Sequence, residues 1–242
     1  MSSSTSNNIK IRLATKDDHD LILDCFRKWY WPEEPLSVGF QIKTPSFVEE
    51  ETFSSIPEKG LSLIAFETKN NENNLNDDNG AGGGNNQTND DSNNEIPIGF
   101  LVNGLSYPNL GLELHNKFKD LGCKRMMALL NLIDVIDKKE DIFKKFSTEK
   151  TFNLISVAVS PEYRGKNIGY RLFERAFQMA KTLGFKIANV DCSSYYSAKI
   201  AEKCKMQLIA EIAYTEHKDS DGNQIFKPPP PHTHMKRYAK IL

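Results

Sequence analysis

Short apolar runs and longer amphipathic stretches alternate along this chain. Two runs, residues 61–67 and 96–102, are apolar and bounded by polar residues, as the strands of a hairpin are. In the second half, similar runs are separated by stretches whose apolar residues recur at helical spacing. There we predict strands at 153–159, 186–191, 208–214 and 234–241 and helices at 168–183 and 198–204. This alternation, with roughly 30 residues per unit, predicts a mixed α/β sheet.

The first half carries weaker versions of the same signals. Residues 9–14 read as a strand, and an acidic pair after it is typical of a helix start. The apolar positions that follow suit a helix, and they are Leu21, Leu23, Cys25, Phe26 and Trp29. Residues 46–55 predict a second helix, and residues 117–146 contain helical material with one apolar stripe.

The stretch from Asn70 to Asn94 differs in composition from its flanks. Eleven of its 25 residues are Asn and four are Gly, and Leu75 is its only large apolar side chain. Such a segment cannot bury enough surface to offset the entropy of ordering it. We therefore expect one domain over residues 9–242, with a disordered insertion at 70–94 inside the hairpin loop and a disordered start at 1–8. A linker between two domains is the alternative.

Charge and composition narrow the class of ligand. The formal net charge is −1, but the Asn-rich stretch holds five acids and no cation, so the rest of the chain has a net charge of +4. A net charge of −1 offers no field for nucleic acid and no basic stripe for an anionic membrane. The mildly basic body suits a small anionic ligand better than a polycation. No apolar run approaches the roughly 20 residues that cross a bilayer, and the first residues do not resemble a secretory signal. Four cysteines without paired spacing indicate free thiols. Since neither a membrane span nor a secretory signal is evident, we expect a cytoplasmic protein, and we expect it to be a monomer.

The most specific chemical signal is the segment that joins the strand at 153–159 to the following helix. Pro161 ends the strand, while Gly165 and Gly169 allow backbone amides to approach a ligand. Since the first turn of a helix has unpaired N–H groups, such a loop predicts a phosphate site. It is not a P-loop, because Asn167 follows Lys166, and it lacks the spacing of a dinucleotide loop. Taken alone, the loop is also compatible with a turn that binds nothing.

The run ISVAVSPEYRGKNIGYRLFERAFQMAKTLGF resembles the coenzyme A loop of the GCN5-related N-acetyltransferase (GNAT) superfamily. The superfamily pattern is Gln/Arg-x-x-Gly-x-Gly/Ala, and Arg164 and Gly169 match it. Asn167 replaces the middle glycine, and asparagine tolerates left-handed backbone geometry. The resemblance implies a mostly antiparallel, mixed sheet of about seven strands flanked by helices, with a splayed strand pair that binds acetyl-CoA. The implied cofactor contacts are Val157, Ala158 and Val159 for pantetheine and Arg164, Gly165, Lys166, Asn167, Ile168 and Gly169 for pyrophosphate.

Three further segments resemble the insect arylalkylamine (dopamine-like) N-acetyltransferases. They are Trp31-Pro32-Glu33-Glu34-Pro35-Leu36, residues 191–199, and Pro231-His232-Thr233-His234. The resemblance implies a small arylalkylamine substrate of the dopamine, tyramine, serotonin or tryptamine class. It also implies Glu34 as base, with Ser193 and Ser197 assisting, and Glu33 is the rival for that role. One departure is Cys204-Lys205-Met206 in place of Leu-Gly-Phe, which removes a glycine that would end the helix in a left-handed cap.

The chemistry explains why these groups are needed. An alkylammonium titrates near ~10, and only the neutral amine attacks a thioester, so a base must remove a proton. A hydroxyl that protonates the departing thiolate completes the reaction, and Tyr196 is preferred over Tyr195 for that role. Ser193 or Ser194 could equally cap the helix that follows.

Other kinds of site are less well supported. Cys192 has no neighbouring histidine, and no set of residues has the spacing of a metal site. The alternatives for function are a polyamine, other small-amine or peptide acetyltransferase, and a regulator that binds acetyl-CoA without turnover.

Overall fold

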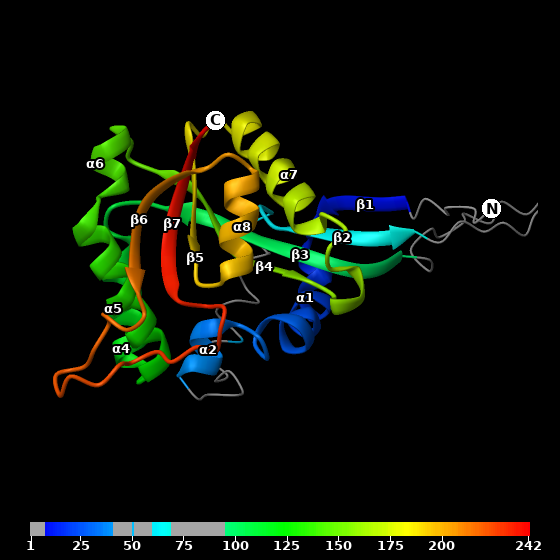
Figure 1. Cartoon of the computed structure of the whole chain (residues 1–242). Coiled ribbons are helices and arrows are strands. Elements are labelled where there is room, and N and C mark those ends of the chain that lie inside the picture. The colour runs from blue at the N-terminus through cyan, green and yellow to red at the C-terminus, as the bar shows by residue number, and fades with distance from the viewer. Residues whose placement is uncertain (1–7, 41–49, 51–59, 69–94) are drawn as a thin grey trace, which may run out of the picture.

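The structure is a computed structural model, and it describes residues 8–40, 50, 60–68 and 95–242 (Figure 1). Residues 1–7, the predicted helix at 46–55 apart from Glu50, and the predicted insertion at 70–94 lie outside these residues. No helix in the described ranges is both long enough and apolar enough to cross a membrane.

Seven strands form one sheet, in the order β1-β2-β3-β4-β5-β7-β6. They are β1 (Asn8–Leu13), β2 (Leu63–Thr68), β3 (Glu95–Ser106), β4 (Thr151–Val159), β5 (Ile187–Cys192), β6 (Gln207–Ala213) and β7 (His234–Ile241). All neighbouring pairs are antiparallel except β4 and β5, which run parallel. The predicted mixed and mostly antiparallel sheet is confirmed.

The described helices are α1 (His19–Cys25), α2 (Pro35–Gly39), α4 (Leu110–Asp120), α5 (Lys124–Lys139), α6 (Ile142–Phe146), α7 (Ile168–Thr182) and α8 (Tyr195–Lys203). The helical material predicted at 117–146 begins earlier and is divided into three helices. Gly122 has a left-handed conformation, with φ +64°, and interrupts the helix between α4 and α5. The Asp141 carboxylate caps the start of α6. A π-helical turn, Phe26–Tyr30, continues α1, and the sequence pattern did not predict it.

Side chains that alternate along the strands build a core on each face of the sheet. Leu63 and Ala65 pack in the cluster that holds the buried residues of α7 and α8. Ile64 and Phe66, one residue along, pack with α1 and its π-helical turn on the opposite face. Figure 1 shows α7 and α8 together on one side of the sheet. Each fully buried large side chain contributes about 1.5–3 kcal/mol to the free energy of folding.

The parallel pair β4 and β5 separates after a short contact. The two strands pair only at Phe152↔Ala188, Asn153↔Asn189 and Leu154↔Val190. From Ser156 to Val159, β4 continues with β3 as its single strand partner among the described residues. No described strand pairs with the β5 side of this segment, so its main-chain groups can take other partners there, such as a ligand or a side chain. This is the predicted splayed pair.

The hairpin geometry yields a prediction about residues 70–94. Thr68 and Glu95 flank the segment and are register partners at the ends of β2 and β3, so a short turn can join the strands. We expect a variant with residues 70–94 replaced by a Gly/Ser turn to melt cooperatively. Its Tm should lie within about 4 °C of wild type, equivalent to ~1 kcal/mol. Circular dichroism measures this, and loss of cooperative melting would show that the segment supports the fold.

Candidate active site

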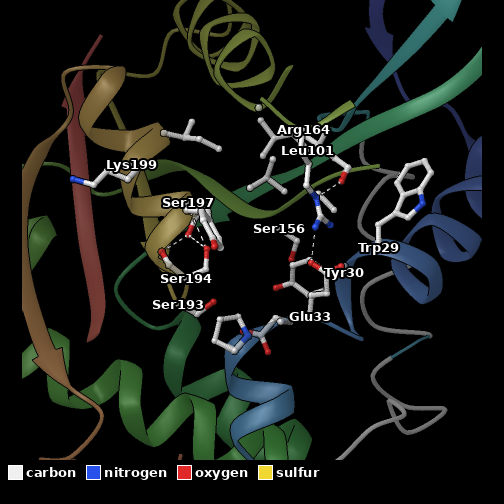
Figure 2. A pocket seen from close by; sticks show the side chains of 18 of the residues that line it. Trp29, Tyr30, Glu33, Leu101, Ser156, Arg164, Ser193, Ser194, Ser197 and Lys199 are labelled. Carbon is white, nitrogen blue, oxygen red and sulfur yellow. Dashed lines mark hydrogen bonds and ion pairs between the residues drawn. The ribbon is translucent and has the colours of Figure 1, made fainter. Parts of the chain in front are cut away.

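A cleft of about 900 Å³ opens where β4 parts from β5. Its walls come from the end of β4, the loop before α7, the start of α8, and the segment from the π-helical turn to α2. In Figure 2, Ser193, Ser194 and Ser197 lie on one side of the cleft, and Trp29, Tyr30 and Arg164 lie on the other.

Most of the predicted site residues line this one cleft. Those that do are Glu34, Val157, Ala158, Val159, Arg164, Gly165, Asn167, Ile168, Gly169, Ser193, Tyr196 and Ser197. Lys166 is the exception, and its ammonium lies over the Tyr163 ring, 4.4 Å from the ring centroid. The structure thus brings together residues that are far apart in the sequence.

Two residues of the loop before α7 have left-handed backbone conformations. Gly165 has φ +79°, and Asn167 is left-handed with φ 62° and ψ 18°. Asn167 therefore adopts the conformation that a glycine favours and asparagine tolerates. The Lys203 ammonium donates a hydrogen bond to Asn167 Oδ1 at 2.7 Å and so links α8 to the loop.

The start of α7 supplies backbone donors beside this loop. The Arg171 amide donates to the Asn167 carbonyl, so the amides of the preceding turn lie outside the i→i−4 ladder. Gly169, in that turn, has a second reason to be small. A Cβ there would come 2.7 Å from Ile200 Cδ1, so Gly169 also lets α7 pack closely on α8.

Arg164 connects the loop to the opposite wall of the cleft. Its Nη1 lies 2.8 Å from Glu33 Oε2, and its Nε donates to the Val159 carbonyl at 3.2 Å (Figure 2). Both charged side chains are about half exposed, so the pair contributes ~1 kcal/mol or less. Glu33, the rival base, is therefore paired with a residue of the predicted cofactor loop.

These features fit acetyl-CoA. The open edge of β4 offers main-chain partners to the pantetheine amides, and the loop and first turn of α7 offer N–H groups to the pyrophosphate. Arg164 and Lys203 line the cleft and add positive charge. Lys203 was not among the predicted site residues, although its bond to Asn167 joins it to the loop.

Glu34 is held at the start of α2 by the residues that follow it. A residue before proline favours extended backbone, and Glu34 has φ −67° and ψ 120°, while Pro35 occupies the first helical position. The carboxylate folds back and caps the helix: Oε1 accepts from the Leu36 amide at 3.1 Å, and Oε2 accepts from the Ser37 amide at 2.6 Å. Oε2 also accepts from the Ser37 hydroxyl at 2.7 Å.

The serines at the start of α8 hydrogen-bond to each other and to Tyr214. Ser194 caps α8, because its Oγ accepts from the Ser197 amide at 2.9 Å, and the Ser197 hydroxyl donates to the Ser194 carbonyl at 3.0 Å. The Ser193 carbonyl accepts from the Tyr214 hydroxyl at 2.6 Å. Within the described ranges, no hydrogen bond joins Glu34 to Ser193 or Ser197. The cap is therefore Ser194, and assistance of Glu34 by the two serines stays a prediction.

His232 is a cleft residue that the sequence reasoning did not place in the site. Its Nδ1 accepts from the Tyr195 amide at 3.1 Å, which leaves the ring proton on Nε2. Burial lowers the pKa of His232 against the opposing effect of the Glu34 charge, so the imidazole is neutral at pH 7. Its ring packs edge-on against Tyr196, with centroids 5.6 Å apart. The sequence feature that could have identified His232 is the segment Pro231-His232-Thr233-His234.

Tyr196 is the better placed of the two candidate tyrosines, because it lines the cleft and Tyr195 does not.

Cys192 does not suit the role of a nucleophile. Burial raises the pKa of its thiol to about 12, so the thiol stays protonated at neutral pH. The described residues contain no cluster of three His, Cys, Asp or Glu side chains that could hold a metal.

The sequence model of the Acetyltransferase (GNAT) family matches residues 127–205, which include β4, the loop, α7, β5 and α8. The resemblance to GNAT acetyltransferases is confirmed. The match supports an acetyl-CoA-dependent N-acetyltransferase.

Solved structures share the fold. The polyamine N-acetyltransferase of Drosophila melanogaster is 23% identical, with 97% of this chain and 100% of that chain covered and a TM-score of 0.79. Arylalkylamine N-acetyltransferase 2 from Aedes aegypti is 22% identical, with 97% and 99% covered and a TM-score of 0.80. The yncA protein of Salmonella typhimurium, solved with its cofactor acetyl-CoA, is 13% identical, with 97% and 94% covered and a TM-score of 0.50. At these identities the likeness concerns the fold.

The left-handed conformation of Gly165 yields a prediction for cofactor binding. We expect Gly165→Val to weaken acetyl-CoA binding, because a β-branched residue at φ +79° is strained. Strain of about 1–3 kcal/mol corresponds to a Kd raised roughly 5- to 150-fold.

Gly165→Asn is the matched control, because asparagine tolerates this conformation, and its Kd should stay within about fivefold of wild type. Calorimetry on folded variants measures both. Equal affinities for Gly165→Val and wild type would contradict a cofactor role for the loop.

Proposed function

We propose that this chain transfers an acetyl group directly from acetyl-CoA to the primary amine of a small arylalkylamine, with Glu34 as the base. The observation that carries the proposal is that Glu34 and the predicted cofactor loop line the same cleft. The open β4 edge at the centre of that cleft would place the reacting end of the cofactor near Glu34.

Acetyl-CoA, when bound, supplies the acetyl group as a thioester. Glu34 then removes a proton from the ammonium, directly or through a water molecule, so that the amine can attack. Of the two carboxylate oxygens, Oε2 accepts two hydrogen bonds and Oε1 accepts one within the described residues, so Oε1 has a lone pair available for that proton. Tyr196 is the proposed donor of a proton to the departing thiolate.

A second cavity extends the cleft and suggests where the rest of the amine substrate lies. It has a volume of about 140 Å³ and shares Tyr30, Glu34 and Ser193 with the main cleft. Its apolar lining includes Leu36, Met126, Leu129, Ile133, Phe226 and Met235. A dry apolar cavity of ~150 Å³ can hold benzene, so this volume suits a single aromatic ring.

A polyamine is the main alternative substrate, since solved polyamine and arylalkylamine enzymes share this fold equally well. The lining of the small cavity favours the arylalkylamine, because its apolar side chains can surround a ring but offer a second ammonium no hydrogen-bond acceptor. Asp191 also lines the cavity, but its two oxygens already accept from Arg237 at 2.7 and 2.8 Å.

The base assignment predicts opposite outcomes for neighbouring glutamates. Glu34→Ala should lower kcat by about 10²–10⁴ and leave the Kd of acetyl-CoA nearly unchanged, as removal of a general base does. Glu33→Ala should leave kcat near wild type and change cofactor affinity by about fivefold or less, because it breaks only the exposed pair with Arg164. Steady-state kinetics and calorimetry on both variants measure this. The assignment fails if Glu33→Ala is the damaging change.

The substrate assignment predicts selectivity. Wild-type kcat/KM for tyramine should exceed that for agmatine by at least about tenfold, because a second charged group would lose its hydration against the apolar lining of the small cavity. Leu129→Glu, which places a carboxylate in that lining, should lower this ratio. Lys199→Met removes a cation that pairs with Glu202 away from the small cavity, and it should leave the ratio unchanged. A preference for agmatine in the wild type would favour the polyamine alternative.

A further inference from the structure

A buried hydrogen-bonded relay connects α5 to the Glu34 carboxylate. Arg125 Nη1 donates to Ser37 Oγ at 2.7 Å, and Ser37 Oγ donates to Glu34 Oε2 at 2.7 Å. Ser37 is 4% exposed and Arg125 is 7% exposed, so little water competes for these groups. Arg125 lies near the start of α5, far from Glu34 in the sequence, and this contact is tertiary.

The direction of each hydrogen bond in the relay is fixed by chemistry. A guanidinium only donates, so the Ser37 oxygen must accept from Arg125. The single hydroxyl proton of Ser37 is then available for Glu34, whose carboxylate only accepts when it is ionised. Together with the Ser37 amide at 2.6 Å, the hydroxyl occupies Oε2 and leaves Oε1 as the oxygen with remaining capacity.

We propose that Ser37 and Arg125 are positioning residues that hold the Glu34 carboxylate in one orientation, with Oε1 directed toward the reacting amine. The inference rests on the proposed role of Glu34 as base. A general base must lie within hydrogen-bond reach of the proton that it removes, and a misplacement of ~1 Å costs about 10²-fold in rate.

The relay does more than cap α2. The Leu36 and Ser37 amides already bind the Glu34 carboxylate and satisfy the start of this five-residue helix. The Ser37 hydroxyl adds a link from Oε2 to a charged side chain on another helix, and hydrogen bonds to charged groups are stronger than neutral ones. The carboxylate is thereby held from two elements of the fold.

A mutant cycle with Glu34 tests the proposal. Ser37→Ala should lower kcat about 10- to 100-fold with the KM for acetyl-CoA unchanged, because the cofactor wall is intact. In the Glu34→Ala background, the same substitution should cause no further loss, since no carboxylate remains to be oriented. A merely structural role would lower kcat by the same factor in both backgrounds.

Two further variants keep the test decisive. Arg125→Lys retains the charge but not the guanidinium fork, and it takes the place of Ser37→Ala if that variant does not fold. It should likewise lower kcat in the wild-type background and cause no further loss in the Glu34→Ala background. Ser62→Ala removes another buried serine hydroxyl, one that accepts from the Asn103 amide at 3.3 Å away from the cleft, and it should leave kcat unchanged. Thermal melting of each variant separates lost stability from lost rate.

The outcomes distinguish this inference from the proposed function. Full kcat in Ser37→Ala and Arg125→Lys, or equal losses in both backgrounds, would overturn the positioning role while Glu34 remains the base. Full kcat in Glu34→Ala would remove the base and the inference with it.

Discussion

The separation of two parallel strands is the constraint on which the rest of the site depends. β4 and β5 pair at three positions, and β4 then continues with β3 as its described strand partner. A cleft opens where they part, and the loop before α7 and the start of α8 lie at its edges. The parting also leaves main-chain donors and acceptors that a ligand can pair with, because buried polar groups need partners. A continuous parallel pair would close this site.

The two walls of the cleft would bind their ligands by different means. The proposed cofactor wall uses backbone geometry, which is why Asn167 can replace a glycine as long as it remains left-handed. The proposed amine wall uses side chains that converge from several elements: Glu34 from the start of α2, Arg125 from α5 and His232 from the segment before β7. A substitution on the cofactor wall should therefore be tolerated if it preserves the backbone conformation, whereas a substitution on the amine wall should change the contacts with the ligand directly.

The elements and the loop could be predicted because their signals are local. Strand β4, the loop and α7 follow one another in the sequence, and their order, spacing and glycines carry the information. Lys205 shows a limit of such reasoning: it adopts φ 56° without being glycine, since its amide and that of Met206 close the end of α8 on Glu202 and Ala201. The relay from Arg125 through Ser37 joins residues 88 positions apart, and no local pattern encodes it.

The proposed function requires that the cleft catalyse acetyl transfer and not merely bind acetyl-CoA. This can be measured as the release of free CoA thiol in the presence and absence of tyramine, with the acetylated amine followed by mass spectrometry. If the cleft catalyses the transfer, thiol release should depend on the amine and should equal the amount of N-acetyl product. Tight acetyl-CoA binding with no amine-dependent thiol release, across arylalkylamines, polyamines and a peptide amine, would contradict it.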